Sequence, residues 1–215
     1  MMPGMGSCRR ARGMGASEPS GVSRRTHATG IAPQPTEGSR PSALIPYHLG
    51  MIDIATIRVM LEYTDWSNAR LLEGATGCTD EQLDRDLQIG PGTLRRILLH
   101  TYNGEMIWLK RWRGIVENPW PGEGERVAIA ELRSRLEENA RARDAWMASL
   151  APSDAARVQQ YRDSKGNIFQ APLGDMLVQG VMHTKHHQAQ AVNALKRLDA
   201  AWPELDYMYR VRKTV

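Results

Sequence analysis

The sequence lacks the features that mark secreted and membrane-spanning proteins. Its 215 residues contain two cysteines, Cys8 and Cys78, which are too few for a disulfide framework. No run of about 18 apolar residues is present, and the opening residues lack the apolar core of a secretory signal. We therefore expect a cytoplasmic protein with no membrane partner.

Several catalytic patterns are also missing. The chain has no C-x-x-C motif, no glycine-rich loop of the phosphate-cradling kind and no Ser-His-Asp arrangement. Cys78 falls in a predicted loop with no evident base beside it, so we interpret it as a bystander. The sequence therefore gives no sign of redox, nucleotide or serine-nucleophile chemistry.

Positive charge is unevenly distributed along the chain. The formal net charge is +4, and residues 1–50 hold six arginines against two glutamates. This leaves 22 basic and 22 acidic residues in 51–215, so the body of the protein is neutral. Because a neutral body is a poor surface for a polyanion, we expect no nucleic-acid partner.

Composition divides the chain into two parts. Residues 1–50 are rich in Gly, Ser, Pro and Arg without apolar periodicity, which predicts a disordered basic extension. An alternative is that they are upstream sequence ahead of a start near Met51. Residues 51–215 contain the periodic segments and are expected to form the folded domain.

Four segments of this domain carry apolar residues at helical spacing. They predict helices over about 52–74, 94–114, 128–150 and 173–198. Four amphipathic helices with short connections bury their apolar stripes best as an all-α antiparallel four-helix bundle.

Shorter features lie between and after these helices. Asp80 is a candidate N-cap for a short turn through Leu87. Residues 161–169 predict a small β-hairpin that turns near Lys165-Gly166, just before the last long helix. Residues 202–215 alternate polar and apolar side chains, which predicts a short extended segment closing over the bundle.

Histidine is the informative residue type. His183, His186 and His187 form an H-x-x-H-H run in the last predicted helix. Positions i and i+4 lie about 40° apart on one face, so His183 and His187 can point at the same spot. They share this face with apolar residues, whereas His186 lies nearer the flank. We interpret His183 and His187 as metal ligands and His186 as an outer-shell or surface residue.

A third ligand has to come from a facing helix. His100 is the other histidine of the domain at a suitable depth, while His27 and His48 precede the domain and are expected to be unrelated. Glycines at 104 and 180, each one turn from a histidine, are expected to leave space for a metal or ligand. Three neutral imidazoles bind Zn²⁺, Ni²⁺ or Fe²⁺ and leave a position open. A hydrogen-bonded core histidine and a solvated histidine face are the alternatives.

Several fragments, in this order and spacing, resemble the DinB/YfiT-like superfamily of metal-binding four-helix bundles over nearly all of 55–213. The fragments are Tyr63-x-x-Trp66-x-Asn68-x-Arg70-Leu71-Leu72, Gly92-Thr93-Leu94-Arg95-x-x-Leu98-Leu99-His100, Trp108-Leu109-x-Arg111-Trp112, Tyr161-x-Asp163-x-x-Gly166, His183-x-x-His186-His187-x-x-Gln190 and Leu205-Asp206-Tyr207.

The resemblance implies an up-down-down-up bundle, frequent homodimers and a divalent metal held by His100, His183 and His187. It also implies a function, because members include thiol-dependent S-transferases and a thiol-using maleylpyruvate isomerase. A small-molecule thiol and an electrophile are then the expected partners. The chain departs from the family at Gln188, where an arginine is frequent, which puts in doubt an arginine contact to an anionic cosubstrate.

Three other functions stay open at this point. A metal-dependent hydrolase would use the same open metal position, although no carboxylate is convincingly placed as its base; Glu105 is expected to point off the His100 face. A non-catalytic metal-binding stress-response protein would use the metal only to stabilise the bundle. Nucleic-acid binding is suggested by the high pI and by the family's link to DNA damage, but the neutral body argues against it.

Overall fold

The structure is a computed structural model that describes residues 52–214. The predicted extension 1–50, with His27 and His48, lies outside the described residues and stays a prediction.

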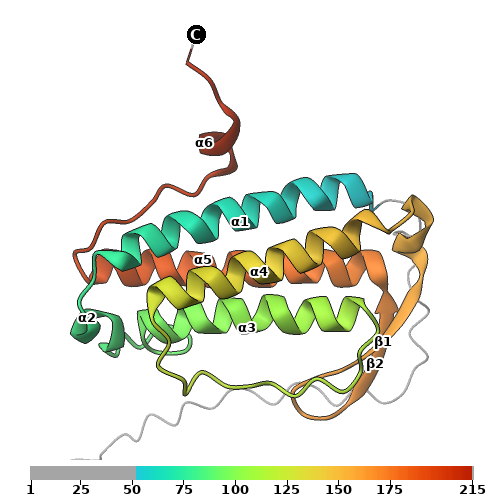
Figure 1. The fold of residues 1–215 in the computed structure, drawn as a ribbon, viewed down its shortest axis with the longest axis horizontal. Coiled ribbons are helices and arrows are strands. Elements are labelled where there is room, and N and C mark those ends of the chain that lie inside the picture. The colour runs from blue at the N-terminus through green and yellow to red at the C-terminus, as the bar shows by residue number, and fades with distance from the viewer. Residues whose placement is uncertain (1–51, 215) are drawn as a thin grey trace, which may run out of the picture. The chain divides into compact units, whose positions relative to one another are not determined.

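Four long helices lie side by side and make up most of the described chain (Figure 1). Asp53 caps the first through the backbone amides of Ala55 and Thr56, and the Thr93 hydroxyl caps the second through the amide of Arg96. Both caps satisfy amides that have no partner inside the helix. The helices are α1 (Ile54–Thr76), α3 (Leu94–Trp112), α4 (Ile129–Ala148) and α5 (Leu173–Arg197), so the four predicted helices are confirmed.

The short helix α2 (Asp80–Asp84) begins one residue earlier than predicted. Its N-cap is Thr79, and Gln82 returns the bond to the Thr79 amide, which completes a capping box. The expectation that Asp80 is the cap was therefore wrong. Asp80 is the first helical residue and its carboxylate accepts from Arg95 instead.

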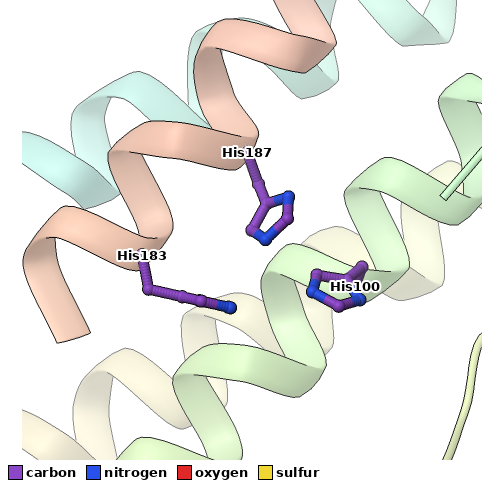
Figure 2. Close-up of side chains that lie close together, drawn as sticks. All are labelled: His100, His183 and His187. Carbon is purple, nitrogen blue, oxygen red and sulfur yellow. The ribbon is translucent and has the colours of Figure 1, made fainter. Parts of the chain in front are cut away.

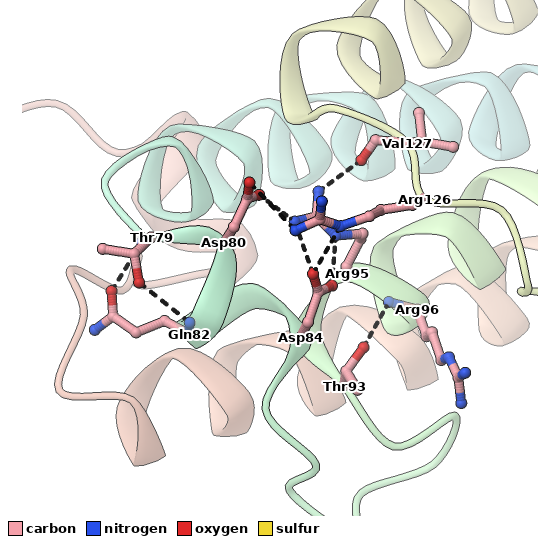
Figure 3. A network of polar contacts seen from close by, with 9 residues as sticks. All are labelled: Thr79, Asp80, Gln82, Asp84, Thr93, Arg95, Arg96, Arg126 and Val127. Atoms are coloured by element: carbon pink, nitrogen blue, oxygen red, sulfur yellow. Dashed lines mark hydrogen bonds and ion pairs between the residues drawn. The ribbon is translucent and has the colours of Figure 1, made fainter.

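Arg95 connects three segments at this end of the protein (Figure 3). Its guanidinium donates to Asp80 and Asp84 of α2 and to the carbonyl of Val127, just before α4. The side chain is buried, and these acceptors satisfy a charge that would otherwise be costly to bury. The hydrogen bond from Arg95 also lowers the pKa of Asp84.

The predicted hairpin is confirmed. Strands β1 (Val158–Arg162) and β2 (Ile168–Pro172) pair antiparallel, from Val158 opposite Pro172 to Arg162 opposite Ile168. The Asp163 carboxylate accepts from the amides of Lys165 and Asn167 in the turn. A short 3₁₀ helix, η2 (Pro152–Ala156), joins α4 to this hairpin.

The C-terminal segment differs from its prediction. It forms the short helix α6 (Tyr207–Val211) rather than an extended strand. A strand needs a neighbour for its backbone hydrogen bonds, whereas α6 makes its own, from Tyr209 N to Asp206 O and from Arg212 N to Met208 O. The alternating pattern was misleading because the apolar side chains of α6 are exposed.

The core of the bundle consists of two apolar clusters, one near each end. The first apolar cluster includes Leu71, Leu94, Leu132 and Leu195, and the second apolar cluster includes Ile57, Trp112, Met147 and Leu177. Between them, each long helix contributes buried polar residues, which we call the central polar layer: Thr64, Ser67, Asn68, Thr101, Asn103, Glu105, Arg143, Thr184, His187 and Gln188. Gln188 Nε2 donates to Asn68 Oδ1 at 2.7 Å, and Asn68 Nδ2 donates to Glu105 Oε1 at 2.8 Å. These bonds join α5, α1 and α3 across the middle of the bundle.

Between residues 52 and 214, no helix combines the length and the apolar character needed to cross a bilayer.

Candidate metal centre

The structure brings His100, His183 and His187 together at the level of the central polar layer (Figure 2). His100 projects from α3, while His183 and His187 project from successive turns of α5. The ring of His187 lies 4.2 Å from that of His100 and 4.6 Å from that of His183, between centroids. One ring nitrogen from each of the three lies within 4.8 Å of the others.

Gly104 makes this convergence possible. A Cβ at position 104 would lie 2.7 Å from Nδ1 of His183, which is too close for two non-bonded atoms. The missing side chain therefore gives room to the His183 ring. The prediction that Gly104 leaves a space for the metal was wrong, because a second histidine fills that space.

Gly180 has a different role from the one predicted. A Cβ there would lie 3.0 Å from Cη2 of Trp112, so this glycine makes room for an indole. Trp112 Nε1 donates to the Met176 carbonyl on α5 at 2.9 Å. The glycine at 180 thus serves the packing of α3 on α5 in the second apolar cluster.

His100 is held by a carboxylate, Glu123, that no sequence pattern singles out. Its Nδ1 lies 2.6 Å from Glu123 Oε1, which also accepts from Trp120 Nε1 at 2.9 Å. The Trp120 ring packs on His100, and Asn103 Nδ2 holds the loop by donating to the Gly122 carbonyl. Glu123 lies in an irregular loop 23 residues away, so no periodic pattern marks it.

His187 is oriented in a similar way. Its Nδ1 lies 2.8 Å from Oε1 of Gln190, whose Nε2 lies 2.9 Å from Nε2 of His186. His186 itself is exposed. When Nδ1 of a histidine is held by an outer oxygen, Nε2 is left for a metal. Both His100 and His187 have this arrangement.

The electrostatics of the site favour neutral imidazoles. Burial, together with the neighbouring histidines, lowers the pKa of His183 to about 4. Burial also lowers the pKa of His187 to about 4. Neutral rings are what a metal needs at pH 7. Nδ1 of His183 is buried and has no hydrogen-bond partner among residues 52–214, so this ring lacks the support that the other two have.

Two further residues lie in the core rather than at the site. Glu105 is buried against Asn68, and burial raises its pKa to about 7. Gln188 is fully buried and donates to the Thr64 carbonyl and to Asn68, so position 188 faces α1. A side chain at this position therefore packs between helices. The absence of arginine there does not remove a contact from the histidine site.

Similar structures share this fold at low sequence identity. A DinB-like protein from Bacillus cereus ATCC 10987 matches with a TM-score of 0.57 and 17% identity, over 71% of this chain and 97% of that one. YfiT from Bacillus subtilis, described as a probable metal-dependent hydrolase with an unusual four-helix bundle topology, matches with a TM-score of 0.55 and 17% identity, over 79% and 94%.

Among curated proteins the chain has no match. The family model of the DinB superfamily matches residues 63–191, which is more than half of the chain and includes all three clustered histidines. The chain belongs to the DinB superfamily.

Proposed function

We propose that the protein binds one divalent metal ion through His100, His183 and His187 and uses an open position of that metal for chemistry. The observation that carries the proposal is the convergence of three imidazole nitrogens within 4.8 Å of one another. The donor set fits a metal because two of the rings are held through Nδ1, while Nδ1 of the third, His183, has no partner among residues 52–214. Zn²⁺ and Ni²⁺ suit three imidazoles best, and Fe²⁺ is also compatible.

The proposed reaction is the transfer of a small thiol to an electrophile. A metal at this site would lower the pKa of a thiol or water molecule that binds to it. Glu123 orients His100 through Nδ1, and Gln190 orients His187. Glu123 Oε1 already accepts from both His100 and Trp120, so we assign Glu123 the role of positioning a ligand. This favours thiol transfer, which needs no separate general base, over hydrolysis.

Metal content tests the first part of the proposal. We would measure bound metal by plasma mass spectrometry on the full chain after exposure to Zn²⁺ or Ni²⁺ and desalting. We expect about one ion per chain, lost in His100→Ala and His187→Ala. His186→Ala is the matched control, because it removes an exposed histidine of the same helix and is expected to keep the metal. A wild-type chain that remains metal-free would overturn the proposal.

Activity measurements separate the candidate reactions. The metal-loaded chain would be mixed with glutathione or cysteine and 1-chloro-2,4-dinitrobenzene, whose chloride leaves as the sulfur–carbon bond forms. Release of nitrophenol from nitrophenyl esters would test the hydrolase alternative, which the description of YfiT supports. Metal binding without either activity would favour a non-catalytic, stabilising metal.

Three further expectations are proposals of the same kind. The up-down-down-up order is supported by where the helices begin. The N-terminal parts of α1 and α5 lie in the second apolar cluster, whereas those of α3 and α4 lie in the first. The homodimer rests on family resemblance, and light scattering of the full chain would test it. A cytoplasmic location rests on the low cysteine content.

A further inference from the structure

Arg111 is a basic residue near the histidine side of α3 that the proposed metal chemistry does not use. It lies on α3, on the same side as Gly104 and Trp108, since steps of three and four residues keep to one helix face. Its guanidinium carbon lies 4.7 Å from the centre of the Trp108 ring and 5.4 Å from that of Tyr161. Two aromatic rings, one from α3 and one from β1, therefore hold the guanidinium in place.

The hydrogen-bonding capacity of this guanidinium is largely unused. One terminal nitrogen, Nη2, donates to the Arg162 carbonyl at 2.9 Å. The Nε atom is buried, and no acceptor for it lies among residues 52–214. Buried donors in folded proteins are nearly always paired, so an unpaired Nε in a half-buried guanidinium indicates a missing acceptor. Burial also lowers the pKa of Arg111.

The Arg111 side chain is also directed along α3 toward the histidines. Side chains of a helix lean toward its N-terminus, and the contact with Trp108, three residues earlier, shows this lean. Toward the N-terminus lies Gly104, whose missing side chain admits His183.

The nearby negative groups do not satisfy Arg111. The Asp163 carboxylate attracts it at a distance, but its oxygens accept from Lys165 and Asn167 within the hairpin turn. A carboxylate suits a guanidinium because two parallel N–H groups match its two oxygens, and it is small enough to form part of a small thiol.

We propose that Arg111, held by Trp108 and Tyr161, binds a carboxylate group of the substrate that the three histidines serve. This inference rests on the proposed function and narrows its thiol to small carboxylate-bearing thiols. The sulfur would lie at the histidines and the carboxylate at Arg111.

Matched thiols with and without a carboxylate test this subsite. The zinc-loaded full chain would be titrated by calorimetry with mercaptoacetate, 3-mercaptopropionate and 4-mercaptobutyrate, and with neutral 2-mercaptoethanol. We expect at least one of the acids to bind about tenfold more tightly than 2-mercaptoethanol, as one charge-assisted hydrogen bond allows. Arg111→Gln should abolish this preference, and Arg111→Lys should keep part of it.

Controls separate recognition from support of the hairpin. Arg113→Gln removes an exposed arginine at the end of the same helix and should leave the preference intact. If Arg111→Gln merely loosened the hairpin, affinity for 2-mercaptoethanol would fall equally, and the inference would be wrong. Zinc bound without any preference for the acids would overturn the subsite alone. A chain that takes up no metal would overturn both the proposed function and this inference.

Discussion

The imidazole of His183 occupies the space that a side chain at Gly104 would fill. The two residues lie on different helices, α5 and α3, so the absence of one side chain sets the position of another across the helix interface. The arrangement of the three histidines therefore depends on a residue that carries no donor atom.

Replacing Gly104 by alanine should weaken the metal site. The new methyl group would collide with the His183 ring, and we expect metal affinity to fall about tenfold to a hundredfold, as it does when outer-shell support of a ligand is lost. Competition with a chromophoric chelator would measure this. Gly124→Ala is the control, since nothing lies within 4 Å of a Cβ there. Unchanged affinity with the higher helix stability that alanine normally brings would contradict the idea.

Gly180→Ala should lower the stability of the fold and leave metal binding unchanged. Its methyl group would press on Trp112 in the second apolar cluster, and overpacking of this kind destabilises by about 1–3 kcal/mol. We expect a lower free energy of unfolding in urea but an unchanged metal content per folded chain. Loss of metal from a variant that is still folded would show that position 180 borders the site after all.

Removing the Glu123 carboxylate should weaken the hold on His100. In Glu123→Ala, Nδ1 of His100 loses its 2.6 Å partner, and outer-shell losses of this kind lower metal affinity about tenfold to a hundredfold. Glu125→Ala, two residues along the same loop, removes a carboxylate that pairs with Arg135 instead and should leave metal affinity unchanged. Equal effects from both variants would indicate a general disturbance of the loop.

Glu105→Gln should stabilise the protein at high pH. Burial raises the pKa of Glu105 from 4.5 to about 7. As pH rises from 4.5 to 7, the unfolded chain loses this proton while the folded chain retains it, so wild-type stability falls across this window. Glutamine does not ionise, so the advantage of the variant should grow by up to about 3 kcal/mol between pH 4.5 and 8.

Urea unfolding of the wild type and of Glu105→Gln at several pH values would measure the difference in their free energies of unfolding. The contribution of the histidines cancels in this difference because both proteins contain them. Glu138→Gln, on the exposed face of α4, should show no such trend. An advantage of Glu105→Gln that does not change with pH would mean that the carboxyl is already ionised when buried.

The sequence predicts the long helices well because each buries one apolar stripe, and the i, i+4 spacing places His183 and His187 on one face. Roles that depend on the segment packed opposite a residue cannot be predicted from the sequence pattern. What fills the space at Gly104 or Gly180 is decided by the opposite helix, and Glu123 reaches His100 from an irregular loop. The α6 segment was misassigned because its alternating apolar residues are exposed.

The central polar layer also determines how the helices align along their axes. If α5 slid by one turn, Gln188 would lose Asn68 and would face apolar side chains of a neighbouring cluster. A shift of α3 would likewise bury Glu105 without its amide partner. These buried hydrogen bonds therefore fix the axial positions of α3 and α5 relative to each other, which places His100 opposite His183 and His187 even without a bound metal.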